Sequence, residues 1–147
     1  YNMSKKSRKY EGVKVLVVED DRNICKDIVD FLERNGCSVN AYPDAYSGRS
    51  AIVNGCNYDI LFTDIAMEGK VGGEHIIDAS RHFNPNVPIV VISETRAYSL
   101  KESTAKYKEG FLATVPNADR QIKKINLNGR KIIPGKDILE CLGELLV

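Results

Sequence analysis

Two short runs of apolar residues are each followed directly by acidic residues. Residues 13–18 lead directly into three consecutive acids, of which Glu19 and Asp20 are the first two, and residues 60–63 lead into Asp64. Continuous apolar runs of this length are typical of parallel strands, because helices cover both faces of such a sheet. Ligands bind at the carboxyl ends of these strands. We therefore expect Glu19, Asp20 and Asp64 to form one acidic pocket that can hold a hard divalent cation.

Between the apolar runs, apolar residues recur at helical spacing. Ile24, Ile28 and Leu32 predict a helix that begins after Asp21 and ends at Asn35-Gly36. Further helices are expected from 43–44 to 53 and from 74 to about 83, and further strands at 37–42 and 89–93. Helix-length segments between strands imply right-handed crossovers, and hence an α/β fold whose parallel sheet carries helices on both faces.

Composition narrows the class of protein. The chain has 147 residues, of which 43% are hydrophobic and 28% charged, and this is typical of one globular domain. The formal net charge of +1 gives no strong bias toward nucleic acid or a membrane surface. Ten Lys and Arg against three acids lie between Arg96 and Lys136, and a solvated basic face is the simpler interpretation of them. Residues 1–12 are polar and basic, so we expect a flexible leader before a single domain at 13–147.

The cysteines indicate a reducing compartment. Cys25, Cys37, Cys56 and Cys141 form no C-x-x-C pair and no cluster with histidine, which suits small core residues better than disulfides or zinc. The sequence also shows no signal-peptide core and no apolar run near 18 residues. We therefore expect a cytoplasmic protein without a membrane partner.

The motifs taken together resemble the receiver domain of bacterial two-component response regulators. In family order they are V-L-V-V-E-D-D, Y-D-I-L-F-T-D-I-A-M and V-P-I-V-V-I-S, and the resemblance covers Val13 to Pro116. It implies a flavodoxin-like, doubly wound sheet of five parallel strands with helices on both faces. It also implies a non-enzymatic, cytoplasmic signalling module of a two-component phosphorelay.

The resemblance also implies a role for each site residue. Asp64 would be the phosphoacceptor, and Mg²⁺ would be held by Glu19, Asp20 and Asp64 together with the carbonyl of Ala66. Ser93 would offer its hydroxyl to a phosphoryl oxygen. The chemistry is consistent with these roles, because a carboxylate attacks a phosphoryl group poorly unless a cation neutralises the charge between them.

The implied partners are a sensor histidine kinase or phosphotransfer protein as donor, and a downstream effector protein or domain. No effector pattern follows the resembling region, and no direct nucleic-acid contact is expected from this chain. A homodimer stays open.

The chain departs from the family at the end of the fifth strand, where the family has a lysine before a proline. The spacing from Ser93 predicts the strand at Phe111–Val115, which places Val115 at the lysine position. A second register places the strand at Arg130–Ile133, with Ile133 at that position and Lys131 on the same strand face. In either register the conserved lysine is missing, so the sequence predicts an atypical receiver.

The favoured first register leaves residues 126–147 as an atypical C-terminal part, with a turn at Asn128-Gly129 and a closing helix. Other departures are Glu94 after Ser93, Glu68 where a proline is common, and Leu112 where an aromatic residue is common.

Three functions are compatible with these residues. The first is a receiver that accepts phosphate on Asp64 and switches a partner-binding face. The second is a pseudo-receiver, an interaction module that acts without phosphorylation, and it is favoured by the missing lysine and by Glu94. The third is a phosphohydrolase, which is disfavoured because Ala66 stands where a second acid is needed. The intact acids favour the first.

Overall fold

The computed structural model describes residues 9–65, 73–93 and 118–146. Strands and helices alternate through most of this part of the chain. In order, the elements are β1 Lys14–Val18, α2 Arg22–Arg34, β2 Ser38–Tyr42, α3 Ala45–Val53, β3 Ile60–Asp64, α4 Gly73–Phe83, β4 Ile89–Ser93, β5 Arg120–Lys123, β6 Ile125–Leu127, β7 Arg130–Ile132 and α7 Gly135–Leu145. The main sheet has the order β2-β1-β3-β4-β5, and every neighbouring pair is parallel. This is the flavodoxin-like order, so the predicted fold is confirmed.

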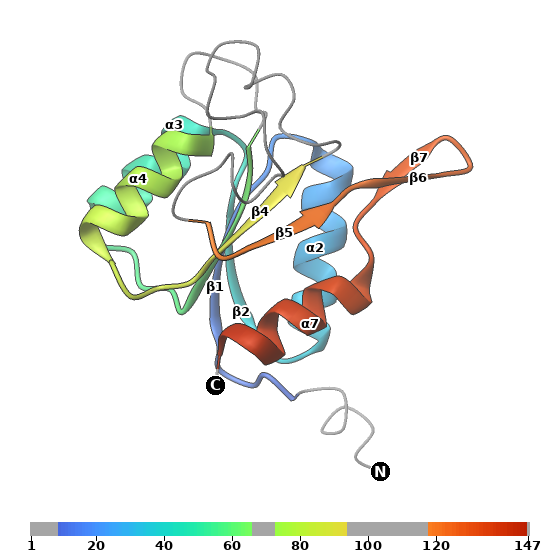
Figure 1. Cartoon of the computed structure of the whole chain (residues 1–147), viewed down its shortest axis with the longest axis horizontal. Coiled ribbons are helices and arrows are strands. Elements are labelled where there is room, and N and C mark those ends of the chain that lie inside the picture. Colours follow the sequence, from blue (N-terminus) through green and yellow to red (C-terminus); the bar gives the residue numbers. More distant parts are fainter. Residues whose placement is uncertain (1–8, 66–72, 94–117, 147) are drawn as a thin grey trace.

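Helices cover both faces of the sheet, with α3 and α4 on one face and α2 and α7 on the other (Figure 1). Alternate strand residues supply two separate cores, because successive side chains of a strand point to opposite faces. Leu16, Leu61 and Val91 belong to the core under α3 and α4. Val17 and Phe62 belong to the core under α2 and α7. Both faces of the sheet are therefore shielded from solvent, which explains why β1, β3 and β4 are continuous apolar runs.

Local signals determine where the helices begin and end. The Asp21 carboxylate accepts the backbone N–H groups of Asn23 and Ile24, and so caps α2. After α2 the chain reverses at Gly36, whose φ of 95° is in the left-handed region that favours glycine. Asp44 caps α3 in the same way, through the N–H of Ser47. These positions are those that the sequence predicted.

The fifth strand corrects the sequence prediction. β5 is Arg120–Lys123, and it pairs with β4 so that Ser93 lies opposite Lys123. The favoured segment, 111–115, lies outside the described residues, and the sheet position predicted for it is held by β5. The second register is wrong because residues 130–132 form β7, antiparallel to β6 in a separate two-stranded sheet. The sequence did not predict β5 because this edge strand has a single buried side chain, Ile122, and therefore no apolar run.

The C-terminal part is a hairpin followed by a helix, and the sequence predicted its turn and its closing helix. Asn128 and Gly129 join β6 to β7 with φ angles of 53° and 80°, the combination that a type I′ turn requires. The hairpin projects from the body of the molecule (Figure 1). Next to the turn, Arg130 pairs with Asp27 of α2, with 2.9 Å between Nη2 and Oδ2.

Residues 9–12, at the end of the predicted flexible leader, contact the domain; residues 1–8 are outside the described part. The N–H of Tyr10 donates to the carbonyl of Asn35, and its side chain packs against the core under α2 and α7. All four cysteines are free, and Cys37 and Cys141 are buried, as expected of small core residues. Among the described residues, no helix has the length and apolar character needed to cross a membrane.

Candidate functional site

Three charged side chains lie at the carboxyl end of the sheet because of strand alternation. Glu19, Asp64 and Lys124 each come two positions after a buried apolar residue that faces α2 and α7; these residues are Val17, Phe62 and Ile122. All three side chains therefore point to that face, just beyond the apolar core. They remain almost entirely enclosed, with relative exposures of 1%, 2% and 8%.

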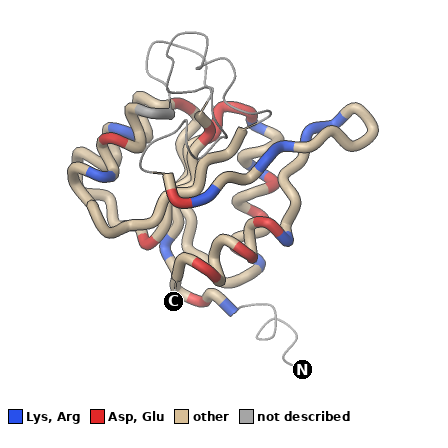
Figure 2. Tube along the Cα trace, viewed as in Figure 1, with Lys and Arg blue, Asp and Glu red and all other residues tan. Residues whose placement is uncertain are grey.

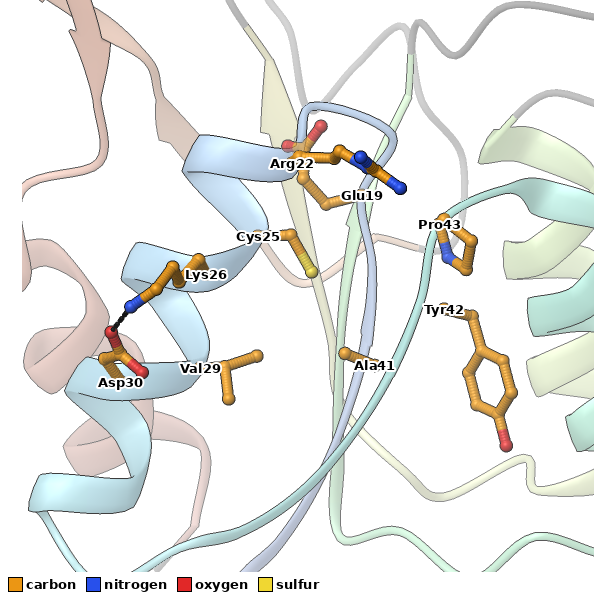
Figure 3. Close-up of a pocket in the computed structure, with 9 residues that line it drawn as sticks. All are labelled: Glu19, Arg22, Cys25, Lys26, Val29, Asp30, Ala41, Tyr42 and Pro43. Carbon is orange, nitrogen blue, oxygen red and sulfur yellow. Dashed lines mark hydrogen bonds and ion pairs between the residues drawn. The ribbon is translucent and has the colours of Figure 1, made fainter.

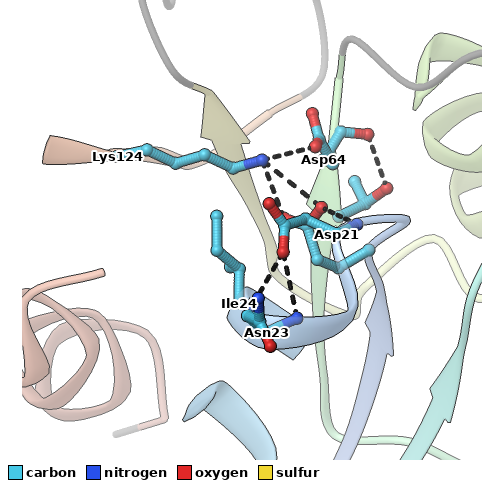
Figure 4. Close-up of polar contacts among 7 residues, drawn as sticks. Asp21, Asn23, Ile24, Asp64 and Lys124 are labelled. Atoms are coloured by element: carbon cyan, nitrogen blue, oxygen red, sulfur yellow. Dashed lines mark hydrogen bonds and ion pairs between the residues drawn. The ribbon is translucent and has the colours of Figure 1, made fainter. Parts of the chain in front are cut away.

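Lys124 binds both carboxylates (Figure 4). Its Nζ lies 2.7 Å from Oδ2 of Asp64, and 3.0 and 3.3 Å from Oε1 and Oε2 of Glu19. Its backbone N–H donates to the carbonyl of Ser93 at 2.7 Å, which extends the pairing of β5 with β4 by one residue. The predicted absence of a lysine from this pocket is therefore wrong.

Sequence reasoning missed Lys124 because it counted from Ser93 at the usual family spacing. Lys124 comes nine positions after Val115, so the stretch between β4 and the lysine is longer than that spacing allows. A local signal did exist. On β1, the charged residue Glu19 comes two positions after the buried apolar residue Val17. Ile122 and Lys124 show the same spacing.

Burial and charge change the acidity of this cluster. The pKa of Glu19 is raised to about 8, first because the carboxyl is buried and then because the Asp64 charge is near; the N–H of Asp21 and the Lys124 ammonium oppose the shift. Burial alone would lower the pKa of Lys124, but the hydrogen bond to Asp64 and the charges of Asp64 and Glu19 outweigh it and raise that pKa. In the metal-free pocket Glu19 therefore favours its neutral form and Lys124 its charged form.

The donor set fits a divalent cation. Glu19, Asp20 and Asp64 each offer one carboxylate oxygen, and these oxygens lie within 4.8 Å of one another. Oε1 of Glu19 is buried, and among the described residues its one close polar partner is the ion-paired ammonium of Lys124. Carboxylate oxygens are the ligands that Mg²⁺ prefers. Ala66, the predicted fourth ligand, lies outside the described residues, as do Glu68, Glu94 and Leu112.

Asp21, the third of the three consecutive acids, has a different role from Glu19 and Asp20. The Asp21 side chain caps α2, and its backbone N–H donates to Oε2 of Glu19 at 3.0 Å. The triplet therefore divides into two potential metal ligands and one helix cap.

Ser93 ends β4 close to the acids. Ile92 is the register partner of Asp64, so Ser93 lies one residue further toward the same edge of the sheet. Ser93 is 3% exposed. The structure thus brings Glu19, Asp20, Asp64 and Ser93 to one edge of the sheet.

A separate hollow of about 390 Å³ lies between α2 and β2 (Figure 3). Cys25, Val29, Ala41 and Pro43 line it together with charged residues, and a Lys26–Asp30 ion pair of 2.7 Å lies on α2 beside it. Burial and the Glu19 charge raise the pKa of the Cys25 thiol, which keeps it protonated and poorly nucleophilic. Glu19 belongs both to this hollow and to the acidic pocket, but Asp20 and Asp64 do not line the hollow.

Basic residues continue from β5 into the hairpin (Figure 2). Several of them pair within the chain: Arg120 lies 3.4 Å from Glu144, and Arg130 pairs with Asp27. Lys124 is turned into the acidic pocket. Part of the basic region that the sequence indicated is thus neutralised internally.

Comparison with known proteins agrees with this geometry. The sequence profile of the response regulator receiver domain matches residues 15–115. A 101-residue alignment, 69% of this chain, is 31% identical to the transcriptional regulatory protein RprY of Bacteroides fragilis. A 112-residue alignment, 74% of the chain, is 29% identical to the nitrogen assimilation regulatory protein NtrX of Azorhizobium caulinodans. The chain belongs to the response regulator receiver domain family.

The aligned parts make up only 39% of RprY and 24% of NtrX. Solved structures match over nearly their whole length. A receiver protein from Sinorhizobium medicae has a TM-score of 0.68 at 20% identity, covering 92% of this chain and 95% of that one. The response regulator TrrA of Thermotoga maritima, solved in complex with Mg²⁺ and BeF, has a TM-score of 0.66 at 22% identity, covering 90% and 98%. At these identities the structures show the shared fold.

Proposed function

We propose that this receiver domain accepts a phosphoryl group on Asp64 while Glu19, Asp20 and Asp64 bind Mg²⁺. The observation that carries the proposal is the contact of 2.7 Å between Nζ of Lys124 and Oδ2 of Asp64, in the same pocket as the other carboxylates. This arrangement supplies both a nucleophile and a fixed positive charge beside it.

The transfer begins with attack of the Asp64 carboxylate on phosphorus. A new bond forms between that oxygen and phosphorus, the bond from phosphorus to the donor breaks, and the donor leaves with the electron pair. When bound, Mg²⁺ would neutralise charge between the carboxylate and the incoming group. Lys124 would stabilise charge on the transferred group, and Ser93 would donate its hydroxyl to one phosphoryl oxygen. Family membership supports a phosphohistidine of a sensor kinase or phosphotransfer protein as donor.

The proposed output is a changed surface that binds an effector protein or domain. The pseudo-receiver alternative rested on a missing lysine and on Glu94. Lys124 removes the first argument, Glu94 lies outside the described residues, and family membership supports the receiver function. We therefore retain only the phosphoacceptor function.

The test is mass spectrometry after incubation with acetyl phosphate and Mg²⁺. We expect one added phosphoryl group on the wild type and none on Asp64→Asn. The matched control is Asp59→Asn, because Asp59 precedes the same strand at its opposite end, where it accepts the N–H of Lys14. Labelling of Asp64→Asn at the wild-type level would disprove the assignment.

A further inference from the structure

Asp119 joins the starts of β4 and β5 to helix α4. Its Oδ2 accepts the N–H of Ile89 at 2.7 Å and the guanidinium of Arg81 at 2.7 Å. Its own N–H donates to the carbonyl of Ile89 at 2.8 Å. Arg81 also donates to the carbonyl of Val87 at 2.9 Å, so it is anchored to the turn before β4. Asp119 and Arg81 thus form a polar clasp at the end of the sheet opposite the acidic pocket.

Among the described residues, apolar packing holds β5 only weakly. It is an edge strand of four residues that pairs on one side only, and Ile122 is its one buried side chain. Residues 94–119 separate it from β4 along the chain, so no short turn ties the two strands together.

The register of β5 determines where Lys124 points. Strand side chains alternate between the two faces, so a slip of one residue moves every side chain to the opposite face. Such a slip would turn Lys124 away from Asp64 and bring Lys123 or Ile125 to its place. The clasp precedes Lys124 by five residues, and at the other end of the strand the Lys124 N–H donates to the Ser93 carbonyl while its ammonium reaches Asp64.

We propose that Asp119, held by Arg81, is a positioning residue that sets the register of β5 and thereby places the Lys124 ammonium on Asp64. Asp119 does not touch the pocket and acts through the strand. Its effect on phosphoryl chemistry rests on the proposed function, whereas its effect on the position of Lys124 does not.

The first test follows the strand itself by amide hydrogen exchange. In Asp119→Ala, exchange at Lys124 should be about tenfold faster or more, as expected for loss of hydrogen bonds to a charged group, while β1 and β3 keep their protection. Asp119→Asn should have a smaller effect, because an amide oxygen can still accept the Ile89 N–H. Unchanged protection at Lys124 in the alanine variant would overturn the proposal.

The matched control is Tyr58→Phe. The Tyr58 hydroxyl bonds to Ser80 at 2.7 Å and to Asn84 at 2.9 Å, so the variant loses a hydrogen-bond network that involves α4 but does not reach β5. It should leave exchange at Lys124 unchanged. An acceleration as large as that of Asp119→Ala would mean that Lys124 responds to any loss of polar contacts near α4, and would overturn the specific role of Asp119.

The second test is a double-mutant cycle that measures the affinity for beryllofluoride with Mg²⁺. Asp119→Ala should weaken beryllofluoride binding about tenfold when Lys124 is present. It should have almost no effect in Lys124→Met, because that variant has no ammonium for Asp119 to position. Equal weakening in both backgrounds would indicate general destabilisation and overturn the proposal. If the wild type binds no beryllofluoride, the proposed function fails, and the exchange experiment alone decides the role of Asp119.

Discussion

Lys124 and a divalent cation would share two carboxylate groups. The ammonium contacts Asp64 and Glu19, two of the three residues whose oxygens cluster in the pocket. The lysine therefore opposes metal binding by its charge, although the same charge favours an anionic phosphoryl group. These two effects have opposite signs and can be separated by substitution.

Lys124→Met should tighten Mg²⁺ binding by roughly three- to tenfold and weaken binding of beryllofluoride, because a positive charge has left the pocket. Stability should fall by less than the ~3–5 kcal/mol typical of a broken buried ion pair, since the raised pKa of Glu19 leaves that carboxyl largely protonated below pH 8. Titration calorimetry measures both affinities. Lys123→Met is the control, because Lys123 is exposed and its side chain points to the opposite face. Weaker Mg²⁺ binding in Lys124→Met would contradict this account.

Glu19 should make the stability of the metal-free protein depend on pH. Its folded pKa of about 8 lies above the ordinary 4.5, so its favourable contribution is complete below about pH 4.5 and is lost as the pH rises through 8. The free energy of unfolding should therefore decrease between about pH 4.5 and 8, by at most about 1.4 kcal/mol per pH unit. Urea unfolding in a chelator measures it. Glu19→Gln should remove this decrease, whereas Glu33→Gln, at an exposed position on α2, should retain it.

At the scale of elements, the junction of β1 and α2 combines a ligand site with a helix cap. Asp20 contributes an oxygen to the acid cluster, while Asp21 stabilises the first turn of α2. Adjacent residues of one type therefore have distinct tasks, because the chain turns between the strand and the helix.

Substitutions at these two positions should give a crossed result. Asp21→Ala should lower stability by about 1 kcal/mol, as for other N-cap losses, with Mg²⁺ affinity nearly unchanged. Asp20→Ala should weaken Mg²⁺ binding by about tenfold or more and leave stability nearly unchanged. Chemical unfolding and Mg²⁺ titration of both variants provide the comparison. Two variants with the same profile would show that the acids are not divided in this way.

Glycines of the C-terminal part should respond to alanine in opposite directions. Gly129 has a φ of 80°, so Gly129→Ala should destabilise the hairpin by about 1 kcal/mol. Gly143 is inside α7 and an added Cβ would meet only the Tyr10 hydroxyl at 3.5 Å, so Gly143→Ala should stabilise the domain by about 0.5–1 kcal/mol. Amide exchange in β6 and β7 reports the first change and urea unfolding the second. A destabilised Gly143→Ala would indicate closer packing between α7 and the segment at Tyr10.

For the whole molecule, the pocket joins segments that are distant in sequence. Glu19, Asp64 and Lys124 come from β1, β3 and the residue after β5, so a ligand held by all of them would bind only the folded chain. Ligand binding and global stability are therefore linked.

Mg²⁺ with beryllofluoride should raise the thermal midpoint of the wild type. At a ligand concentration of 100 times Kd, the gain in free energy of unfolding is about 2.7 kcal/mol. Asp64→Asn should show no such rise, whereas Asp59→Asn should behave as the wild type. Differential scanning calorimetry makes the comparison, and an equal rise in Asp64→Asn would place the ligand elsewhere.

The sequence by itself determined the features that depend on neighbours along the chain. The apolar runs of β1, β3 and β4 predicted buried parallel strands, and the acids at their ends predicted where Glu19, Asp20 and Asp64 would meet. Caps such as Asp44 and the Asn128-Gly129 turn were readable because the hydrogen bonds and φ angles that they satisfy are local.

Only the tertiary structure decided the register of β5 and the partner of Asp64. An edge strand buries too few side chains to show a pattern, and the contacts that hold it come from Ile89, Arg81 and Ser93, far away in sequence. Spacing along the sequence therefore could not predict that Lys124 lies in the pocket. The raised pKa of Glu19 is decided in the same way, because burial and the charge of Asp64 arise only when the strands are assembled.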